Sequence, residues 1–186
     1  MSRFSRIDAV LGGVMVIERQ EISDDRGSFG RLFCQNDLKS FGWNKPVAQV
    51  NVSRTRAAGS VRGLHYQLPP HAEVKYVVCN IGKIFDVAVD LRRNSPSFLQ
   101  WRGFELSAEN RRGLMIPEGF AHGFQTLTND VEMVYFHSAP YAKEADSGLH
   151  VLDPRLAIRW PLPVSGLSDK DAKSPMITES FRGIEL

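Results

Sequence analysis

The feature that most constrains the fold is a succession of short runs rich in Val, Ile, Phe and Tyr, separated by turn residues rather than by helices. Runs of this composition are typical of β-strands. Parallel strands need long crossover connections, which this sequence lacks, so we expect an all-β antiparallel sandwich or barrel of the jelly-roll type. The strands are predicted at Val14–Glu18, Gly30–Gln35, Val47–Ser53, Val61–Tyr66, Val74–Asn80, Lys83–Asp90, Trp101–Leu106, Arg112–Ile116, Phe120–Thr126 and Val131–His137.

The segments between and after these runs carry few helix signals. Asp37–Phe41 predicts one short helical turn, and Leu167–Leu186 predicts an irregular wrap around the core. Asn80–Lys83 contains a glycine between two β-prone runs and predicts a hairpin turn. No repeat or linker is visible, so we expect one domain over residues 1–186.

Composition excludes several classes of protein. With 42% hydrophobic and 24% charged residues, the chain is expected to bury a core and not to be disordered. A formal net charge of +2 without a basic run argues against a nucleic-acid partner. Two cysteines and no signal-peptide pattern point to a reducing cytoplasm. Charged residues interrupt the most apolar stretch, Val74–Leu91, so no membrane-spanning helix or membrane partner is expected.

Alternation along two strands separates polar from apolar side chains. Gln49, Asn51 and Ser53 share one face, and the face opposite is apolar. Asp86 and Asp90 likewise lie opposite an apolar row. The polar faces have two interpretations, a solvated outer surface or the lining of a pocket inside a barrel.

Pro117–His122 has the form P-x-G-x-x-H, which resembles the second motif of the cupin superfamily of jelly-roll barrels. Metal-binding cupins carry an H-x-H pair in their first motif, but the corresponding segment here is His65-Tyr66-Gln67. His65, His71, Glu73 and His122 have no spacing that predicts convergence on one metal ion. We therefore expect neither a metal nor another cofactor.

Longer matches cover nearly the whole chain. Val61–Gln67, Lys75 and Phe85–Arg92 resemble the dTDP-4-dehydrorhamnose 3,5-epimerase family, metal-free cupins that invert carbons flanking the ketone of a 4-keto nucleotide sugar. The further matching segments are Asp25–Gly27 with Phe29, Gln49–Ser53, Ile116–Phe124, Tyr135, Asp153–Pro154, Trp160–Pro161 and Leu167–Asp171. The resemblance implies epimerisation of a nucleotide-activated 4-keto-6-deoxy sugar at C3, C5 or both, without a cofactor.

Epimerisation beside a ketone requires a base, a donor for the enolate oxygen and an acid on the opposite face. The resemblance implies that His65 is the base, Asp171 orients it, and Tyr135 is the acid. It also implies substrate contacts: positive charges for sugar and diphosphate, polar groups for the sugar, an aromatic side chain that stacks on the nucleobase, and an amino-terminal segment that reaches the nucleotide. These residues are Arg26, Phe29, Arg31, Gln49, Asn51, Arg62, Lys75, His122, Tyr141, Asp146 and Lys170.

Two departures from the family bear on the nucleotide. Arg31 and Asp146 stand where members of the family usually carry Glu. Arginine can only donate hydrogen bonds, which suits the acceptors of guanine or cytosine better than the ring N–H of thymine. Arg31 therefore predicts that GDP or CDP binds more tightly than dTDP.

The resemblance further implies a homodimer with an exchanged amino-terminal strand. Three alternatives remain open: a single-centre epimerase or 3,4-ketoisomerase that uses the same enolate, a catalytically silent sugar-binding cupin, and a metal-dependent cupin oxygenase. Retention of His65, Tyr135 and Asp171 argues against the silent protein, and the missing H-x-H pair argues against the oxygenase.

Overall fold

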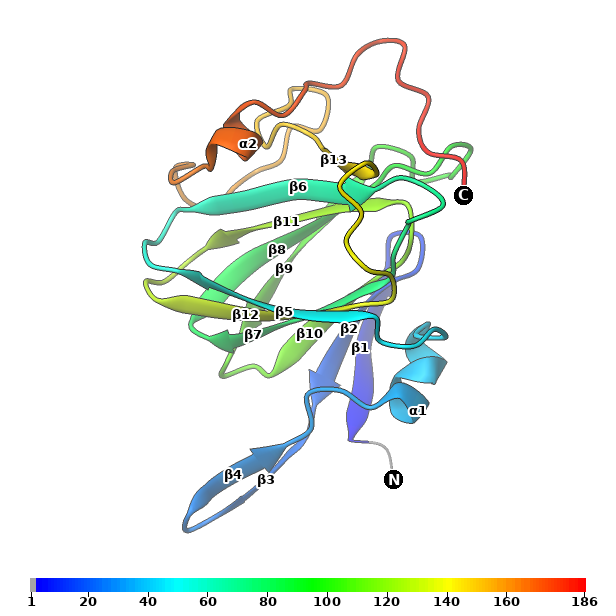
Figure 1. Ribbon diagram of the computed structural model, residues 1–186. Helices are drawn as coiled ribbons and strands as arrows, with labels where there is room; N and C mark the ends of the chain where they lie inside the picture. The colour runs from blue at the N-terminus through cyan, green and yellow to red at the C-terminus, as the bar shows by residue number, and fades with distance from the viewer. Residues whose placement is uncertain (1–2) are drawn as a thin grey trace.

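Two antiparallel sheets pack face to face in the computed structural model of the chain, which describes residues 3–186 (Figure 1). The six-stranded sheet has the order β1 (Phe4–Val10), β2 (Val14–Arg19), β10 (Arg112–Ile116), β7 (Lys75–Ile81), β12 (Val131–His137) and β5 (Gln49–Thr55). The five-stranded sheet has the order β13 (Asp146–Gly148), β6 (Val61–Gln67), β11 (Phe120–Thr126), β8 (Lys83–Asp90) and β9 (Trp101–Ser107). The predicted all-β jelly roll is confirmed.

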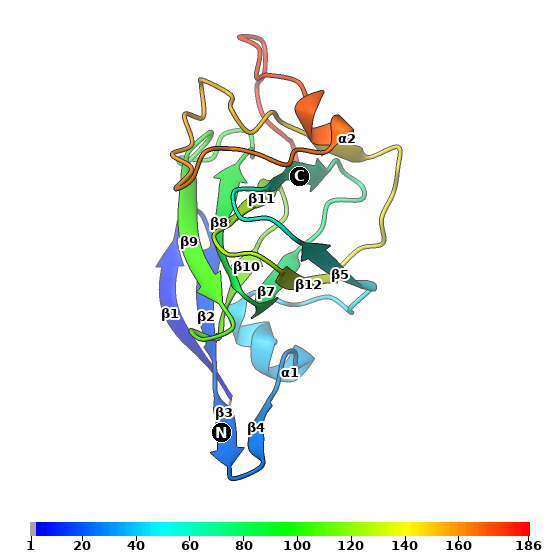
Figure 2. The same cartoon turned by 90° about the vertical axis from the view of Figure 1, so that its left-hand side faces the viewer.

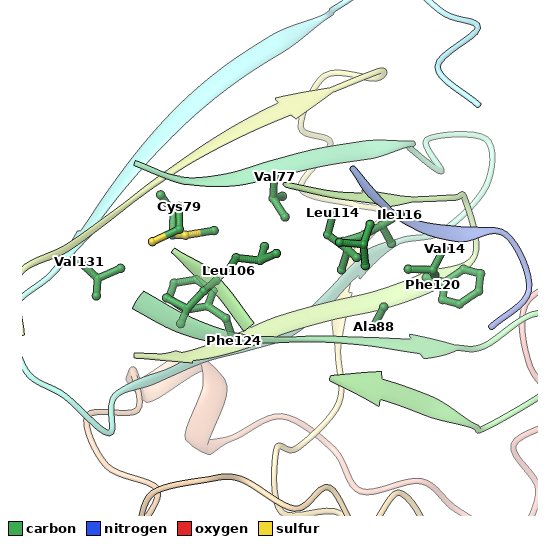
Figure 3. Packing of buried hydrophobic residues seen from close by; sticks show 13 residues of the cluster. Val14, Val77, Cys79, Ala88, Leu106, Leu114, Ile116, Phe120, Phe124 and Val131 are labelled. Carbon is green, nitrogen blue, oxygen red and sulfur yellow. The ribbon is translucent and has the colours of Figure 1, made fainter. Parts of the chain in front are cut away.

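The space between the sheets holds a continuous hydrophobic core (Figure 3). Val77 and Leu114 from the six-stranded sheet meet Ala88, Leu106 and Phe124 from the five-stranded sheet. Burial of these apolar side chains stabilises the fold by about 25 cal/mol per Å² removed from water. Cys79 lies in the same cluster, and burial raises the pKa of its thiol to about 12, which disfavours the reactive thiolate.

Both outer sheet faces are also covered. The irregular carboxy-terminal segment packs on the five-stranded sheet, where Val87, Val89 and Leu91 of the predicted apolar row contact Leu156 and Ile177. This coverage confirms the predicted wrap. Because the apolar row points outward beneath the wrap, the intervening side chains of β8 point between the sheets. The polar face of β8 is therefore interior and not solvated.

The amino-terminal region differs from the prediction. Gly30–Gln35 is not a strand: pairing ends at Gly30, and the following residues pack against the outer face of the six-stranded sheet. A separate two-stranded hairpin, β3 (Glu21–Asp24) and β4 (Gly27–Gly30), precedes this segment. The apolar residues that suggested a strand here pack against the six-stranded sheet and do not form strand hydrogen bonds. The short helical turn was predicted correctly, as α1 (Gln35–Leu38) followed by a 3-10 turn, η1 (Lys39–Phe41).

The turn at Asn80–Lys83 is tight, but it is not a hairpin. β7 pairs with β10 and β12, whereas β8 pairs with β11 and β9, so the chain crosses here from one sheet to the other. Gly82 has a φ of +80°, and a Cβ there would lie 2.6 Å from Thr128 Oγ1. The glycine permits the turn, and strand pairing elsewhere decides where the two strands go.

The carboxy-terminal segment contains one further helical turn that was not predicted, α2 (Asp169–Ala172). Ser168 caps it, since its hydroxyl accepts a hydrogen bond from the Asp171 N–H. The cap brings the Asp171 side chain toward β6. In the part of the chain from residue 3 onward, no helix is long and apolar enough to cross a membrane.

Candidate active site

A polar pocket of about 550 Å³ opens between the two sheets. Strands β5, β6, β7, β11 and β12 and the α2 turn all contribute side chains to it. The lining residues are Val50, Asn51, Val52, Ser53, Arg62, His65, Lys75, His122, Phe124, Tyr135, His137, Ser168, Lys170 and Asp171. Asn51 and Ser53 from the polar face of β5 line this pocket. Val50 and Val52, on the other face of the strand, are exposed.

His65 and Asp171 form a short hydrogen-bonded pair across the pocket wall. The distance from His65 Nε2 to Asp171 Oδ1 is 2.6 Å. Burial tends to raise the pKa of the Asp171 carboxyl, but His65, Ser168 and the Gly63 N–H outweigh that effect and hold the pKa below its usual value. An ionised Asp171 accepts the Nε2 proton, which leaves Nδ1 of His65 as the nitrogen that can take a proton.

A close approach of two strands places the histidines. His65 on β6 lies opposite His122 on β11. Gly63 has a φ of +115°, and a Cβ there would lie 2.6 Å from the Gly123 Cα. Any larger residue at position 63 would push the strands apart. The glycine in the Arg62–Gln67 segment therefore serves the geometry of the pocket.

Tyr135 lies on the opposite sheet, with its hydroxyl 2.7 Å from Ser53 Oγ. Burial raises the pKa of the Tyr135 phenol well above its ordinary value, and the Asp86 carboxylate raises it further; the Ser53 hydrogen bond and Arg62 act in the other direction. The phenol is therefore protonated at neutral pH and can donate a proton.

His122 forms a second histidine–carboxylate pair inside the sandwich. Its Nε2 lies 2.6 Å from Asp86 Oδ1, and both side chains are buried. The second carboxylate oxygen of Asp86 is buried without a hydrogen-bond partner among the described residues. The two acidic residues of β8 thus differ in role, because Asp90 accepts hydrogen bonds from Arg92, Ser95 and Ser97 at a turn.

Two cationic side chains reach the pocket from different strands. Arg62 on β6 is oriented by Thr55 Oγ1, which accepts from its Nε at 2.8 Å. Lys75 on β7 is nearly buried, with its Nζ 3.1 Å from Glu73 Oε1. Cations held inside a partly enclosed pocket favour phosphate groups and developing oxyanions.

Four more of the predicted binding residues lie at the rim of the pocket, where an ion pair and hydrogen bonds connect them. Lys170 pairs with Asp146, and the Tyr141 hydroxyl donates to Asp146 Oδ2 at 3.0 Å. The Tyr141 backbone N–H donates to Gln49 Oε1 at 3.0 Å. Tyr141 itself is exposed, so one face of its ring is free to stack.

Three predicted binding residues lie away from this pocket. Arg26 and Phe29 belong to the β3–β4 hairpin, which projects beyond the sandwich in both views (Figures 1 and 2). Arg31 follows that hairpin and pairs with Asp37 at 3.3 Å. Within a single chain, these three side chains do not line the pocket that holds His65.

Several residues that line the pocket or bond to its lining were not predicted as site residues. Ser53, His137 and Ser168 line it, Asp86 bonds to His122, and Glu73, considered only as a metal ligand, bonds to His137. Strand alternation placed Ser53 on the face of Asn51, and it could have identified His137, which shares a face with Tyr135. The Ser-x-x-Asp pattern of a helix cap could have identified Ser168.

The four residues weighed as metal ligands do not assemble. His71 lies 3.7 Å from Glu144, while His65 and His122 each pair with an aspartate. Within residues 3–186, no group of three or more His, Cys, Asp or Glu side chains could hold a metal ion.

Known proteins of one family are similar to this chain over most of its length. The family model described as dTDP-4-dehydrorhamnose 3,5-epimerase matches residues 8–179. A relative from Shigella flexneri named dTDP-4-dehydrorhamnose 3,5-epimerase is 44% identical over 85% of this chain and 87% of its own length.

Two solved structures share the fold. The dTDP-6-deoxy-D-glucose-3,5-epimerase of Legionella pneumophila, in complex with dTDP-4-keto-L-rhamnose, has a TM-score of 0.88 and 39% identity, with 93% of this chain and 92% of the other covered. A 3'-monoepimerase from Streptomyces bikiniensis, in complex with dTDP-quinovose, has a TM-score of 0.82 and 36% identity, with 88% and 83% covered. With its cupin-type jelly roll and its matched sequence, the chain belongs to the dTDP-4-dehydrorhamnose 3,5-epimerase family of isomerases.

Proposed function

We propose that this protein epimerises a dTDP-linked 4-keto-6-deoxy sugar at the two carbons that flank the ketone, C3 and C5. The observation that carries the proposal is the placement of a base and an acid on opposite sheets of one pocket. His65 comes from one sheet and is paired with Asp171 of the α2 turn, and a protonated Tyr135 comes from the other sheet. Inversion requires proton removal on one face of a carbon and return on the other.

In the proposed reaction, Nδ1 of His65 takes the proton from a carbon beside the ketone, and Asp171 stabilises the imidazolium that forms. The electron pair moves onto the ketone oxygen, where the Lys75 ammonium offsets the negative charge of the enolate. Tyr135 then delivers a proton to the opposite face of the same carbon. Its phenolate recovers a proton from solvent, and His65 releases the proton that it took.

Product identification tests the proposal against a single-centre epimerase and a 3,4-ketoisomerase. The enzyme is incubated with dTDP-4-keto-6-deoxyglucose, and proton couplings in the NMR spectrum give the configuration of the sugar. We expect inversion at both C3 and C5. Inversion at C3 alone would place the protein with single-centre enzymes such as the 3'-monoepimerase, and a ketone moved to C3 would identify a ketoisomerase.

The base of the nucleotide is open to a direct test, because two arguments predict different results. The relatives named above act on or bind thymidine-linked sugars, whereas Arg31 predicts GDP or CDP. The Asp37 carboxylate beside Arg31 supplies a hydrogen-bond acceptor next to the donors of the guanidinium. A base bound beside Arg31 could therefore still be thymine, because its ring N–H can donate to Asp37. We expect calorimetric titration to give tightest binding for dTDP. Tighter binding of GDP or CDP that Arg31→Glu abolishes would establish the guanidinium as the base-reading group.

We further propose a homodimer in which the β3–β4 hairpin of one subunit reaches the pocket of the other. The hairpin exposes Ile22 and Phe29, and the β5 edge strand exposes Val50 and Val52 beside the pocket. Exposed apolar groups of this kind favour association. Since both cysteines are free, the assembly suits a reducing cytoplasm.

Sedimentation and one substitution test the dimer. We expect a mass of twice the 20.9 kDa chain. Arg26→Ala should weaken dTDP binding by about tenfold, as expected for a lost charge-assisted contact, although Arg26 lies outside the pocket of its own chain. The matched control is Arg6→Ala, also exposed and in the amino-terminal region but outside the hairpin. A monomer, or unchanged binding in Arg26→Ala, would contradict the proposal.

A further inference from the structure

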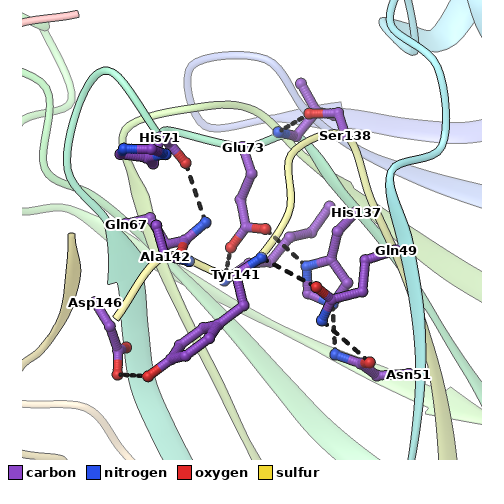
Figure 4. Close-up of polar contacts among 12 residues, drawn as sticks. Gln49, Asn51, Gln67, His71, Glu73, His137, Ser138, Tyr141, Ala142 and Asp146 are labelled. Carbon is purple, nitrogen blue, oxygen red and sulfur yellow. Dashed lines mark hydrogen bonds and ion pairs between the residues drawn. The ribbon is translucent and has the colours of Figure 1, made fainter. Parts of the chain in front are cut away.

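Glu73, Lys75 and His137 form a nearly buried polar cluster in the pocket wall, and the proposed proton transfers leave two of these residues without a role. Glu73 Oε2 lies 2.8 Å from His137 Nδ1 (Figure 4). Glu73 Oε1 lies 3.1 Å from Lys75 Nζ. The His137 ring stacks against the ring of Tyr135, with 6.2 Å between the two ring centroids. The cluster is therefore in direct contact with the proposed acid.

The cluster ends a chain of hydrogen bonds that begins at the pocket rim (Figure 4). The Tyr141 backbone N–H donates to Gln49 Oε1 at 3.0 Å. Gln49 Nε2 donates to Asn51 Oδ1 at 3.2 Å. Asn51 Nδ2 lies 3.5 Å from His137 Nε2, and the chain continues through His137 Nδ1 to Glu73.

The donor-to-acceptor direction of these hydrogen bonds follows from the two groups at their ends, the Tyr141 backbone N–H and the Glu73 carboxylate. A backbone N–H can only donate, so Gln49 must turn its oxygen to Tyr141 and its amide nitrogen to Asn51. Asn51 then turns its own nitrogen to His137. An amide nitrogen also only donates, so Nε2 of His137 must accept, and its ring proton must lie on Nδ1, where Glu73 accepts it.

Glu73 carries the negative charge of the cluster. Burial tends to raise the pKa of the Glu73 carboxyl, but the hydrogen bond from His137 and the charge of Lys75 hold the pKa below its usual value. Glu73 is therefore a carboxylate at neutral pH, and the ammonium of Lys75 balances its charge. The carboxylate can accept the Nδ1 proton of His137.

We propose that Glu73 is a positioning residue that holds Lys75 in the pocket and fixes His137 in its Nδ1–H form, so that Nε2 accepts a hydrogen bond from a sugar hydroxyl. The identity of the ligand as a sugar rests on the proposed function. Ketone and phosphate oxygens have no proton to donate, so within the sugar and the diphosphate only a hydroxyl can donate to Nε2. The long contact from Asn51 is the one that a hydroxyl can replace. His137 thereby selects sugars that carry a free hydroxyl beside Tyr135.

The ¹⁵N spectrum of the substrate-free enzyme tests the tautomer without any assumption about the reaction. The chain has five histidines, and the signals of His137 are identified as those lost in His137→Phe. We expect a protonated Nδ1 and an unprotonated Nε2. A proton on Nε2, or an imidazolium at neutral pH, would overturn the proposal even if the enzyme is an active epimerase.

Glu73→Gln tests the positioning role. A carboxylate offers acceptors to two donors at once, whereas the amide has one acceptor and one donor and so must fail either His137 or Lys75. We expect altered His137 signals or at least a tenfold fall in kcat/KM. Glu73→Asp should recover part of the loss, and the control Glu144→Gln changes an exposed carboxylate of the 140–145 loop whose ion-pair partner is His71, at 3.7 Å. Unchanged signals and kinetics in Glu73→Gln would contradict the assignment.

His137→Phe separates hydroxyl recognition from proton transfer. Phenylalanine keeps the stacking on Tyr135 and removes the acceptor. We expect about a tenfold rise in KM with a small change in kcat, as for loss of one hydrogen bond made equally in ground and transition states. An unchanged KM would exclude a substrate contact at Nε2. If no sugar is turned over at all, the proposed function fails, and the tautomer measurement still decides the role of Glu73.

Discussion

His65→Asn is expected to abolish exchange of the sugar protons with solvent while leaving nucleotide binding largely intact. Asparagine preserves a polar side chain beside Asp171 but cannot take a proton from carbon. Loss of a positioned base costs about 10²–10⁴-fold in rate, so kcat should fall by at least that range. Solvent-exchange NMR measures the chemical step, and calorimetry with dTDP measures binding.

The matched control for His65→Asn is His71→Asn, which changes a partly exposed histidine outside the pocket. This variant should retain full exchange and epimerisation. Exchange at the wild-type rate in His65→Asn would show that another residue removes the proton, and the pairing of His65 with Asp171 would then be structural.

Tyr135→Phe should uncouple proton removal from inversion. The ring remains, so the stacking against His137 is preserved, but the hydroxyl that donates to the far face is gone. His65 can still remove and return a proton on its own face. Deuterium from solvent should therefore enter the sugar, while net epimerisation falls by about 10²–10⁴-fold.

Tyr76→Phe is the control for this substitution. Tyr76 lies in the same sheet, its buried hydroxyl has no hydrogen-bond partner among the described residues, and it does not line the pocket. This variant should epimerise normally. Inversion at the wild-type rate in Tyr135→Phe would mean that water or another residue is the acid.

The local sequence pattern was sufficient to separate the two faces of a strand. The alternation of β5 placed Asn51 and Ser53 together, and both line the pocket. The two interpretations left open for β8 are also resolved: the wrap covers the apolar row of the strand, so Asp86 points inward to His122. Alternation shows that two faces differ, but only tertiary packing decides which one is interior.

The hairpin predicted at Asn80–Lys83 and the strand predicted at Gly30–Gln35 were wrong because contacts between residues far apart in sequence decide the structure there. The β-prone runs on both sides of Gly82 are real strands, yet each pairs with partners far away in sequence. After Gly30, which ends the β3–β4 hairpin, Leu32, Phe33 and Cys34 are apolar because they cover a sheet, and none of the described strands pairs with them. Glu73 and His137 are 64 residues apart, and neither residue alone carries a signal of the buried hydrogen-bonded pair.

Solvent deuterium incorporation tests the central claim most directly. The wild-type enzyme is incubated with dTDP-4-keto-6-deoxyglucose in deuterated water, and proton NMR follows the signals of the sugar carbons. Proton removal by His65 and return from a solvent-exchanged Tyr135 predict deuterium at C3 and C5 of the inverted sugar, and none at C1 or C2. An inverted product that retains its original protons at both carbons flanking the ketone would contradict the account.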